Sequence, residues 1–185
     1  VARLAPVFGE VLAQLSARVP GLQAVLPTVA HVAPALRDAL ANWSVRPILL
    51  DPSEAPDSYA ADKRAAFRAA DVALAASGTV SLELAAVGTP MVIAYDMSWL
   101  SRQIIGRMLL VDTVTLVNLV SETREVPEFI GKNCKPSEIA KAVQQVLDAP
   151  GGQRQAMDLT MQRLGRGGEE PGLRAARSVL KLVTP

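Results

Sequence analysis

Short apolar segments alternate with amphipathic segments along the first half of the chain. The apolar segments are too short for ordinary helices and predict buried strands at 22–29, 46–51, 71–76 and 90–95. The segments between them carry apolar residues at helical spacing and predict helices at 1–19, 34–43, 58–70 and 79–88. Short strands that alternate with helices are typical of a parallel sheet covered on both faces. We therefore predict an α/β fold with a doubly wound parallel sheet.

The second half of the chain has a mainly helical pattern. A helix is predicted over 98–110, and the run TVTLVNLV at 113–120 predicts a last strand that continues into a loop. Three further helices are predicted at 136–147, 153–164 and 172–183. The chain begins within a helical pattern, so we assign 1–150 to a Rossmann-like domain that lacks its first strand, with a processed N-terminus as the alternative. Residues 151–185 are assigned to C-terminal helices.

Composition narrows the class of protein. Half of the 185 residues are apolar, which is enough for one sizeable core. The formal net charge is +1, with 19 basic and 18 acidic residues spread along the chain, so no nucleic-acid partner is predicted. Cys134 is the only cysteine, which excludes an internal disulfide and fits a reducing, cytoplasmic compartment. No apolar run approaches the roughly 18 to 20 residues that span a bilayer.

The turn Ser77-Gly78-Thr79 follows a predicted strand and precedes a predicted helix. Ligands of doubly wound sheets bind outside the carboxyl ends of the strands, at such turns. Gly78 allows close approach of the backbone, and the first amides of the helix have no partner within it. The helix dipole adds partial positive charge at the same end. These features predict a phosphate site.

Glu83 lies one helical turn beyond this predicted phosphate site. Thr79 and Glu83 are four residues apart and share one side of the helix, next to an apolar stripe. An ionised carboxylate only accepts hydrogen bonds and suits the two vicinal hydroxyls of a ribose. The alternative is a helix cap, but a capping box needs Ser or Thr where Val80 stands. A phosphate at the turn and a ribose at Glu83 together indicate a nucleotide.

Other polar or reactive residues carry weaker signals. His31 follows a predicted strand but is interpreted as a bystander at a loop edge. Cys134 has only Lys132 and Lys135 as charged neighbours and is not predicted to be catalytic. The glycines of 165–168 lack a preceding strand, so they favour a linker between helices. The apolar residues of 98–110, interleaved with arginines, fit either core packing or contact with acyl chains.

The run SGTVSLELAAVGTPMVIAYDMS (77–98) resembles the nucleotide-sugar-binding half of the lipid-A-disaccharide synthase family, which are glycosyltransferases of GT-B architecture. That family carries Ser-Gly-Thr-x-x-Leu-Glu, then Pro-Met-Val and Tyr-x-x-Ser-x-Leu. The matching residues are Ser77, Gly78, Thr79, Leu82, Glu83, Pro90, Met91, Val92, Tyr95, Ser98 and Leu100. Arg107, Asn118, Pro127-Glu128 and the CKPSEIA run follow in family order. The likeness extends over the whole chain and is strongest between 71 and 128.

The resemblance implies an activity for the whole enzyme. It transfers a diacylated glucosamine from a UDP donor to a lipid acceptor, diacylglucosamine 1-phosphate, and releases UDP in lipid A and lipopolysaccharide biosynthesis. The resemblance also implies that no metal or cofactor is needed, that the enzyme is peripheral on the inner membrane, and that the catalytic base lies in an N-terminal domain outside this chain. The 185-residue chain alone is expected to bind UDP weakly and to turn over nothing. The oligomeric state is open, with a homodimer as one option.

The same resemblance assigns residues to the UDP-binding site. Ser77, Gly78 and Thr79 are expected to bind the diphosphate and Glu83 the ribose. Tyr95, Ser98 and Asn118 are expected as further donor-site residues. The family usually has Arg-Glu after the Asn, whereas Arg124-Glu125 is displaced by one position here, so the role of Arg124 is left open.

Two other functions remain open at this level. One is a non-catalytic nucleotide-binding or interaction module with the same sheet. The other is a GT-B-like sugar-nucleotide epimerase. An epimerase needs paired acid and base side chains beside the sugar, and no such pair follows the Glu83 motif.

Overall fold

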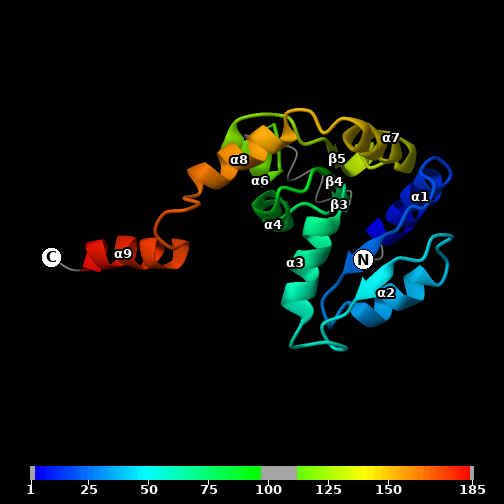
Figure 1. Cartoon of the computed structure of the whole chain (residues 1–185), viewed down its shortest axis with the longest axis horizontal. Helices are drawn as coiled ribbons and strands as arrows, with labels where there is room; N and C mark the ends of the chain where they lie inside the picture. The colour runs from blue at the N-terminus through cyan, green and yellow to red at the C-terminus, as the bar shows by residue number, and fades with distance from the viewer. Residues whose placement is uncertain (1–2, 97–111, 184–185) are drawn as a thin grey trace.

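The computed structural model of the protein describes residues 3–96 and 112–183. Within these residues, short parallel strands alternate with helices, which confirms the predicted α/β class (Figure 1). The strands are β1 (Val25–Pro27), β2 (Ile48–Leu50), β3 (Ala73–Ala75), β4 (Met91–Tyr95) and β5 (Glu128–Ile130). The helices are α1 (Leu4–Ser16), α2 (Ala33–Leu40), α3 (Tyr59–Ala69), α4 (Val80–Val87), α6 (Leu116–Ser121), α7 (Pro136–Asp148), α8 (Gln153–Arg163) and α9 (Pro171–Val183).

The strands form two parallel sheets. β1 pairs with β2, so that Val25 lies opposite Ile48. β4 is the central strand of the second sheet and pairs with β3 on one side and β5 on the other. The sequence predicted one sheet, whereas no ladder joins β1 to β3 within the described part of the chain.

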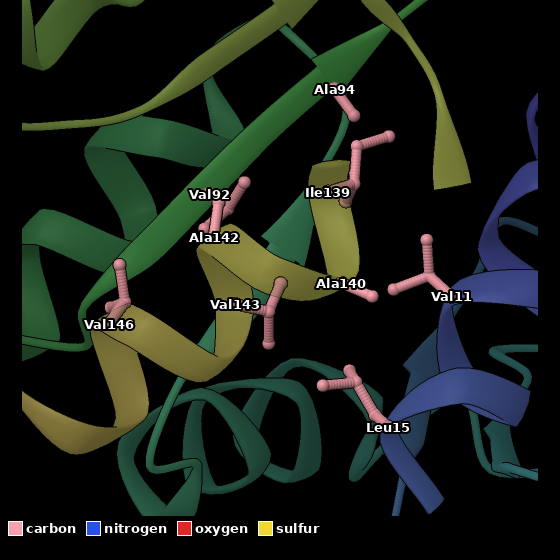
Figure 2. Close-up of a cluster of buried hydrophobic side chains, with 9 residues drawn as sticks. All are labelled: Val11, Leu15, Val92, Ala94, Ile139, Ala140, Ala142, Val143 and Val146. Atoms are coloured by element: carbon pink, nitrogen blue, oxygen red, sulfur yellow. The ribbon is translucent and has the colours of Figure 1, made fainter. Parts of the chain in front are cut away.

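Side chains of β4 alternate between two cores, as expected for a strand buried on both faces. Val92 and Ala94 pack against α1 and α7, in a cluster that Figure 2 shows from Val11 and Leu15 on one side to Val146 on the other. On the opposite face, Met91 and Ile93 pack with α4, α6 and α8. Helices therefore cover both faces of the three-stranded sheet, and the predicted double winding is confirmed.

The predicted strand at 113–120 is wrong. Residues 116–121 form helix α6, and the last strand is β5, which the sequence pattern did not indicate. The Val- and Thr-rich run has high strand propensity, but packing against α8 decides its structure. Val117 is fully buried, and its carbonyl accepts hydrogen bonds from the hydroxyls of Ser121 at 2.7 Å and Thr160 at 3.2 Å. β5 follows a proline and begins with a glutamate, so propensity argues against it.

The two C-terminal helices differ in their packing. Helix α8 contributes Ala156 and Met157 to the core around β4. Helix α9 extends away from the rest of the chain (Figure 1), and its Leu173, Val179 and Leu180 are exposed. The predicted helices at 153–164 and 172–183 are confirmed, and the helix predicted at 98–110 lies outside the described residues.

Candidate functional site

The turn between β3 and α4 lies at the carboxyl end of the three-stranded sheet. β3 ends at Ala75, which pairs with Ile93 of β4, and α4 begins at Val80. Continuing this register by two residues brings Ser77 level with Tyr95, the last residue of β4. The sequence and the fold therefore agree on the placement that ligand sites of doubly wound sheets have.

The backbone of this turn presents several unused hydrogen-bond donors. Among the described residues, the amides of Gly78, Thr79 and Val80 form no hydrogen bond. Ser81 uses both its amide, at 3.3 Å, and its hydroxyl, at 3.0 Å, on the carbonyl oxygen of Gly78, which fixes the turn to the first turn of α4. Thr79 is exposed and makes no side-chain cap.

Gly78 has a left-handed φ of +139°, a backbone conformation that strains any residue with a Cβ. Among the described residues, apart from Gly78 and its chain neighbours, no atom lies within 4 Å of a Cβ placed there. Free amides at a helix N-terminus can bind an anion such as a phosphate. The hydroxyls of Ser77 and Thr79 flank the same glycine and add two further donors.

Glu83 lies on the exposed side of α4, as predicted, and its side chain is 47% exposed. It does not cap the helix. Its carboxylate forms an ion pair with Lys63 of α3, with 2.6 Å between Nζ and Oε2. Lys63 also lies over the ring of Phe67, 5.3 Å from its centroid. The sequence did not indicate Lys63, because its place beside Glu83 depends on the packing of α3 against α4.

The remaining predicted donor-site residues differ in their accessibility. Tyr95 is 37% exposed at the end of β4 and lies near the turn in sequence register. Ser98 lies outside the described residues. Asn118 is 1% exposed, and its amide is used inside the protein: Nδ2 donates to the Val126 carbonyl at 2.9 Å, and Oδ1 accepts from the Val126 amide at 3.0 Å. In this structure Asn118 holds the segment that leads to β5.

Glu128, the first residue of β5, completes this network. It accepts hydrogen bonds from the Thr113 hydroxyl and from the Thr115 amide, the latter at 2.8 Å. Burial by itself raises the pKa of Glu128, but these hydrogen bonds outweigh it and hold the pKa below its ordinary value. The charged carboxylate therefore fixes residues 113–115 against β5.

Arg124 and Glu125 have separate structural contacts. Arg124 forms an ion pair with Asp112 and donates to the Thr123 carbonyl. Glu125 accepts a hydrogen bond from the amide of Gly152 at 3.1 Å, at the start of α8. A Cβ at Gly152 would lie 2.6 Å from the carboxyl carbon of Glu125, so a larger residue there would require the exposed Glu125 side chain to shift.

A buried carboxylate lies at the carboxyl end of β2. Asp51 is 3% exposed and accepts hydrogen bonds from the amide and the hydroxyl of Ser53, at 2.8 and 2.7 Å. These bonds, together with an ion pair to Arg37 at 2.7 Å, lower the pKa of Asp51 despite its burial. All of these contacts are internal, so we interpret Asp51 as part of the β2 turn.

Comparison with known proteins identifies the family. The family described as lipid-A-disaccharide synthetase matches residues 1–181. This chain belongs to that family. A lipid-A-disaccharide synthase of Ruegeria pomeroyi is 57% identical over 181 residues, which are 97% of this chain and 45% of the relative. One from Rhodospirillum centenum is 39% identical over 187 residues, covering all of this chain and 45% of the relative.

The match covers nearly all of this chain but less than half of each relative. A lipid-A-disaccharide synthase of Nitrobacter winogradskyi is also 39% identical, over 96% of this chain and 44% of the relative. The chain thus spans less than half the length of the curated relatives that it matches. The resemblance predicted from residues 77–98 is confirmed. Among the described residues, no helix is both long and apolar enough to cross a membrane.

Proposed function

We propose that this chain is the donor-binding part of a lipid-A-disaccharide synthase. The amides of Gly78, Thr79 and Val80 carry the proposal: they form no hydrogen bond among the described residues, and such amides at a helix N-terminus suit the diphosphate of a UDP-sugar. Ser77 and Thr79 supply hydroxyl donors, Glu83 accepts from the ribose, and Tyr95 borders the site from β4. Ser98 remains a predicted contact. Asn118 acts on the site by fixing the segment before β5.

The whole protein, on this proposal, transfers a diacylglucosamine from its UDP donor to diacylglucosamine 1-phosphate and releases UDP. Amides, hydroxyls and a helix N-terminus stabilise the leaving diphosphate without a metal ion, which is the preorganised electrostatic stabilisation that dominates much enzyme catalysis. The general base belongs to the part of the relatives' length that this chain does not cover. Because donor and acceptor both carry acyl chains, the protein is expected on the inner membrane as a peripheral protein.

The two parallel sheets support a proposal about the rest of the domain. In a doubly wound sheet of order 3-2-1-4-5-6, the first strand lies between strands 2 and 4. We match β1 and β3 to those two neighbours, since each has an edge that carries no ladder within the described residues. We propose that a parallel strand from outside these residues pairs with both edges and joins the two sheets.

The donor site is tested by titrating the purified chain with UDP. Glu83→Gln keeps the shape of the side chain but removes its charge and one acceptor oxygen. Loss of charge-assisted hydrogen bonds to the ribose is expected to cost about 1.5 to 3 kcal/mol. The dissociation constant should therefore rise by one to two orders of magnitude, as measured by calorimetry or by NMR titration.

Glu138→Gln is the matched control, since Glu138 is also an exposed glutamate in the first turn of a helix, α7. Its UDP affinity should equal that of the wild type. Equal affinities of the Glu83 and Glu138 variants would refute the ribose assignment. Disaccharide formation by the 185-residue chain alone would refute the placement of the base outside it.

A further inference from the structure

Glu83 is held by a chain of contacts that begins in the core. Phe67 of α3 packs against the cluster around Leu84, Met91 and Ile93. Its carbonyl oxygen also accepts a hydrogen bond from the Thr89 hydroxyl at 2.6 Å, which attaches the end of α3 to the start of β4. Packing and this hydrogen bond therefore hold Phe67 in place beside the three-stranded sheet.

Lys63 lies one helical turn before Phe67 and is held at two places. Its Nζ is 5.3 Å from the centroid of the Phe67 ring, a cation–π distance, and 2.6 Å from Oε2 of Glu83. The side chain of Lys63 is only 28% exposed, compared with 47% for Glu83. The more buried partner thus restrains the more exposed one.

This ion pair is poorly suited to stabilise the fold. Both side chains reach solvent, and exposed ion pairs contribute little to the free energy of unfolding because water and salt screen them. Its clearer effect is on conformation: a glutamate on an open helix surface samples several rotamers, and each immobilised side chain carries an entropic cost on binding. Because Lys63 already holds the Glu83 side chain, most of this side-chain entropy has been lost before a ligand binds.

The pair leaves Glu83 able to bind. A carboxylate has about four acceptor positions, and one ammonium hydrogen bond uses one of them. The two vicinal hydroxyls of a ribose need two of the remaining acceptor positions. We infer that Lys63 is a positioning residue that holds the Glu83 carboxylate in the orientation that accepts both ribose hydroxyls of the donor, and so sets the preference for a ribonucleotide. This inference rests on the proposed function.

The test compares two ligands, UDP and 2′,3′-dideoxyuridine diphosphate, on the purified chain by NMR titration. Lys63→Met keeps much of the side chain's length and removes its charge. The affinity of Lys63→Met for UDP should fall about threefold to tenfold, the equivalent of ordering one flexible side chain. Its affinity for the dideoxy compound should equal that of the wild type, because that ligand offers Glu83 no hydroxyl. Lys63→Arg should restore most of the preference for UDP.

Arg64→Met is the matched control, since Arg64 is the next residue of α3, is exposed, and carries the same charge. It should leave both affinities unchanged. Thermal unfolding of each variant should stay within a few degrees of the wild type, which shows that any loss of binding is not a loss of fold.

Two results would overturn the inference. If Lys63→Met binds UDP more tightly, Lys63 competes with the ribose. If it weakens UDP and the dideoxy compound equally, Lys63 acts through general charge and not through Glu83. Failure of the proposed function is distinct from both: wild-type chain would then bind UDP no better than the dideoxy compound, and Glu83→Gln would change neither.

Discussion

The two parallel sheets formed by the described residues are built from similar apolar residues but differ in how far they are buried. In β4, Met91, Val92, Ile93 and Ala94 are all 0% exposed. In the two-stranded sheet, Val25 of β1 is 43% exposed and Ile48 of β2 is 58% exposed. A parallel strand reaches full burial only when helices cover both faces and strands cover both edges.

β4 is covered on both faces by helices and on both edges by strands. β3 and β5 pair with its edges, α1 and α7 cover one face, and α4 and α8 cover the other. β1 has one strand partner within the described residues, and no element lies along its second edge as a paired strand. The candidate UDP site belongs to the well-buried sheet, at its edge strand β3. The difference in burial between the two sheets is the reason for proposing a further strand beside β1.

The largest effect is expected when the same substitution, Ile to Ala, is made in each of the two sheets and the changes in stability are compared. Ile93→Ala removes three carbons from a fully buried side chain and should lower the free energy of unfolding by about 2 to 5 kcal/mol. Ile48→Ala removes the same atoms from a largely exposed one and should cost less than about 1 kcal/mol. Urea denaturation of both variants and the wild type gives the two values. Equal costs would contradict the difference in burial.

The proposed strand between β1 and β3 predicts a change in amide hydrogen exchange. By the alternation of parallel ladders, the amides of Val25 and Leu74 face away from the paired strands, whereas those of Leu26 and Ala73 face β2 and β4. In a chain extended at its N-terminus to the length of the relatives, exchange of Val25 and Leu74 should slow by about tenfold or more.

Leu26 and Ala73 serve as internal controls for that exchange experiment, because they are already bonded within their sheets. A general slowing of all four amides would indicate added global stability without a new strand. Unchanged exchange at Val25 and Leu74 would refute the strand.

A smaller effect is expected from pH. The pKa of Glu128 is lowered in the folded protein, so its contribution to stability is present above the ordinary carboxyl pKa and is lost as the pH falls below about 4. Glu128→Gln should therefore be less stable than wild type by about 1 kcal/mol at pH 7, and the difference should shrink in acid. Thermal unfolding at several pH values measures this. A difference that grows toward low pH would contradict the network around Glu128, and Glu138→Gln controls for removal of one negative charge.

Much of the candidate site was predictable because it is local in sequence. Strand, turn and helix around Ser77, Gly78 and Thr79 follow each other without interruption, and helical spacing alone places Glu83 one turn beyond. Gly88 closes α4 with a left-handed φ of +79°, as a glycine in that position predicts. The family motif identified the position of Asn118, but it did not predict that the Asn118 side chain forms hydrogen bonds with the backbone of Val126.

Sequence alone determined the α/β class, the β3–α4 turn and its acidic neighbour, because short-range periodicity and turn chemistry control them. Tertiary structure decided that 116–121 is a helix and that 128–130 is a strand, since packing against α8 and pairing with β4 outweigh the propensities of single residues. It also decided that Lys63 meets Glu83, a contact across 20 positions that only the packing of α3 on α4 creates.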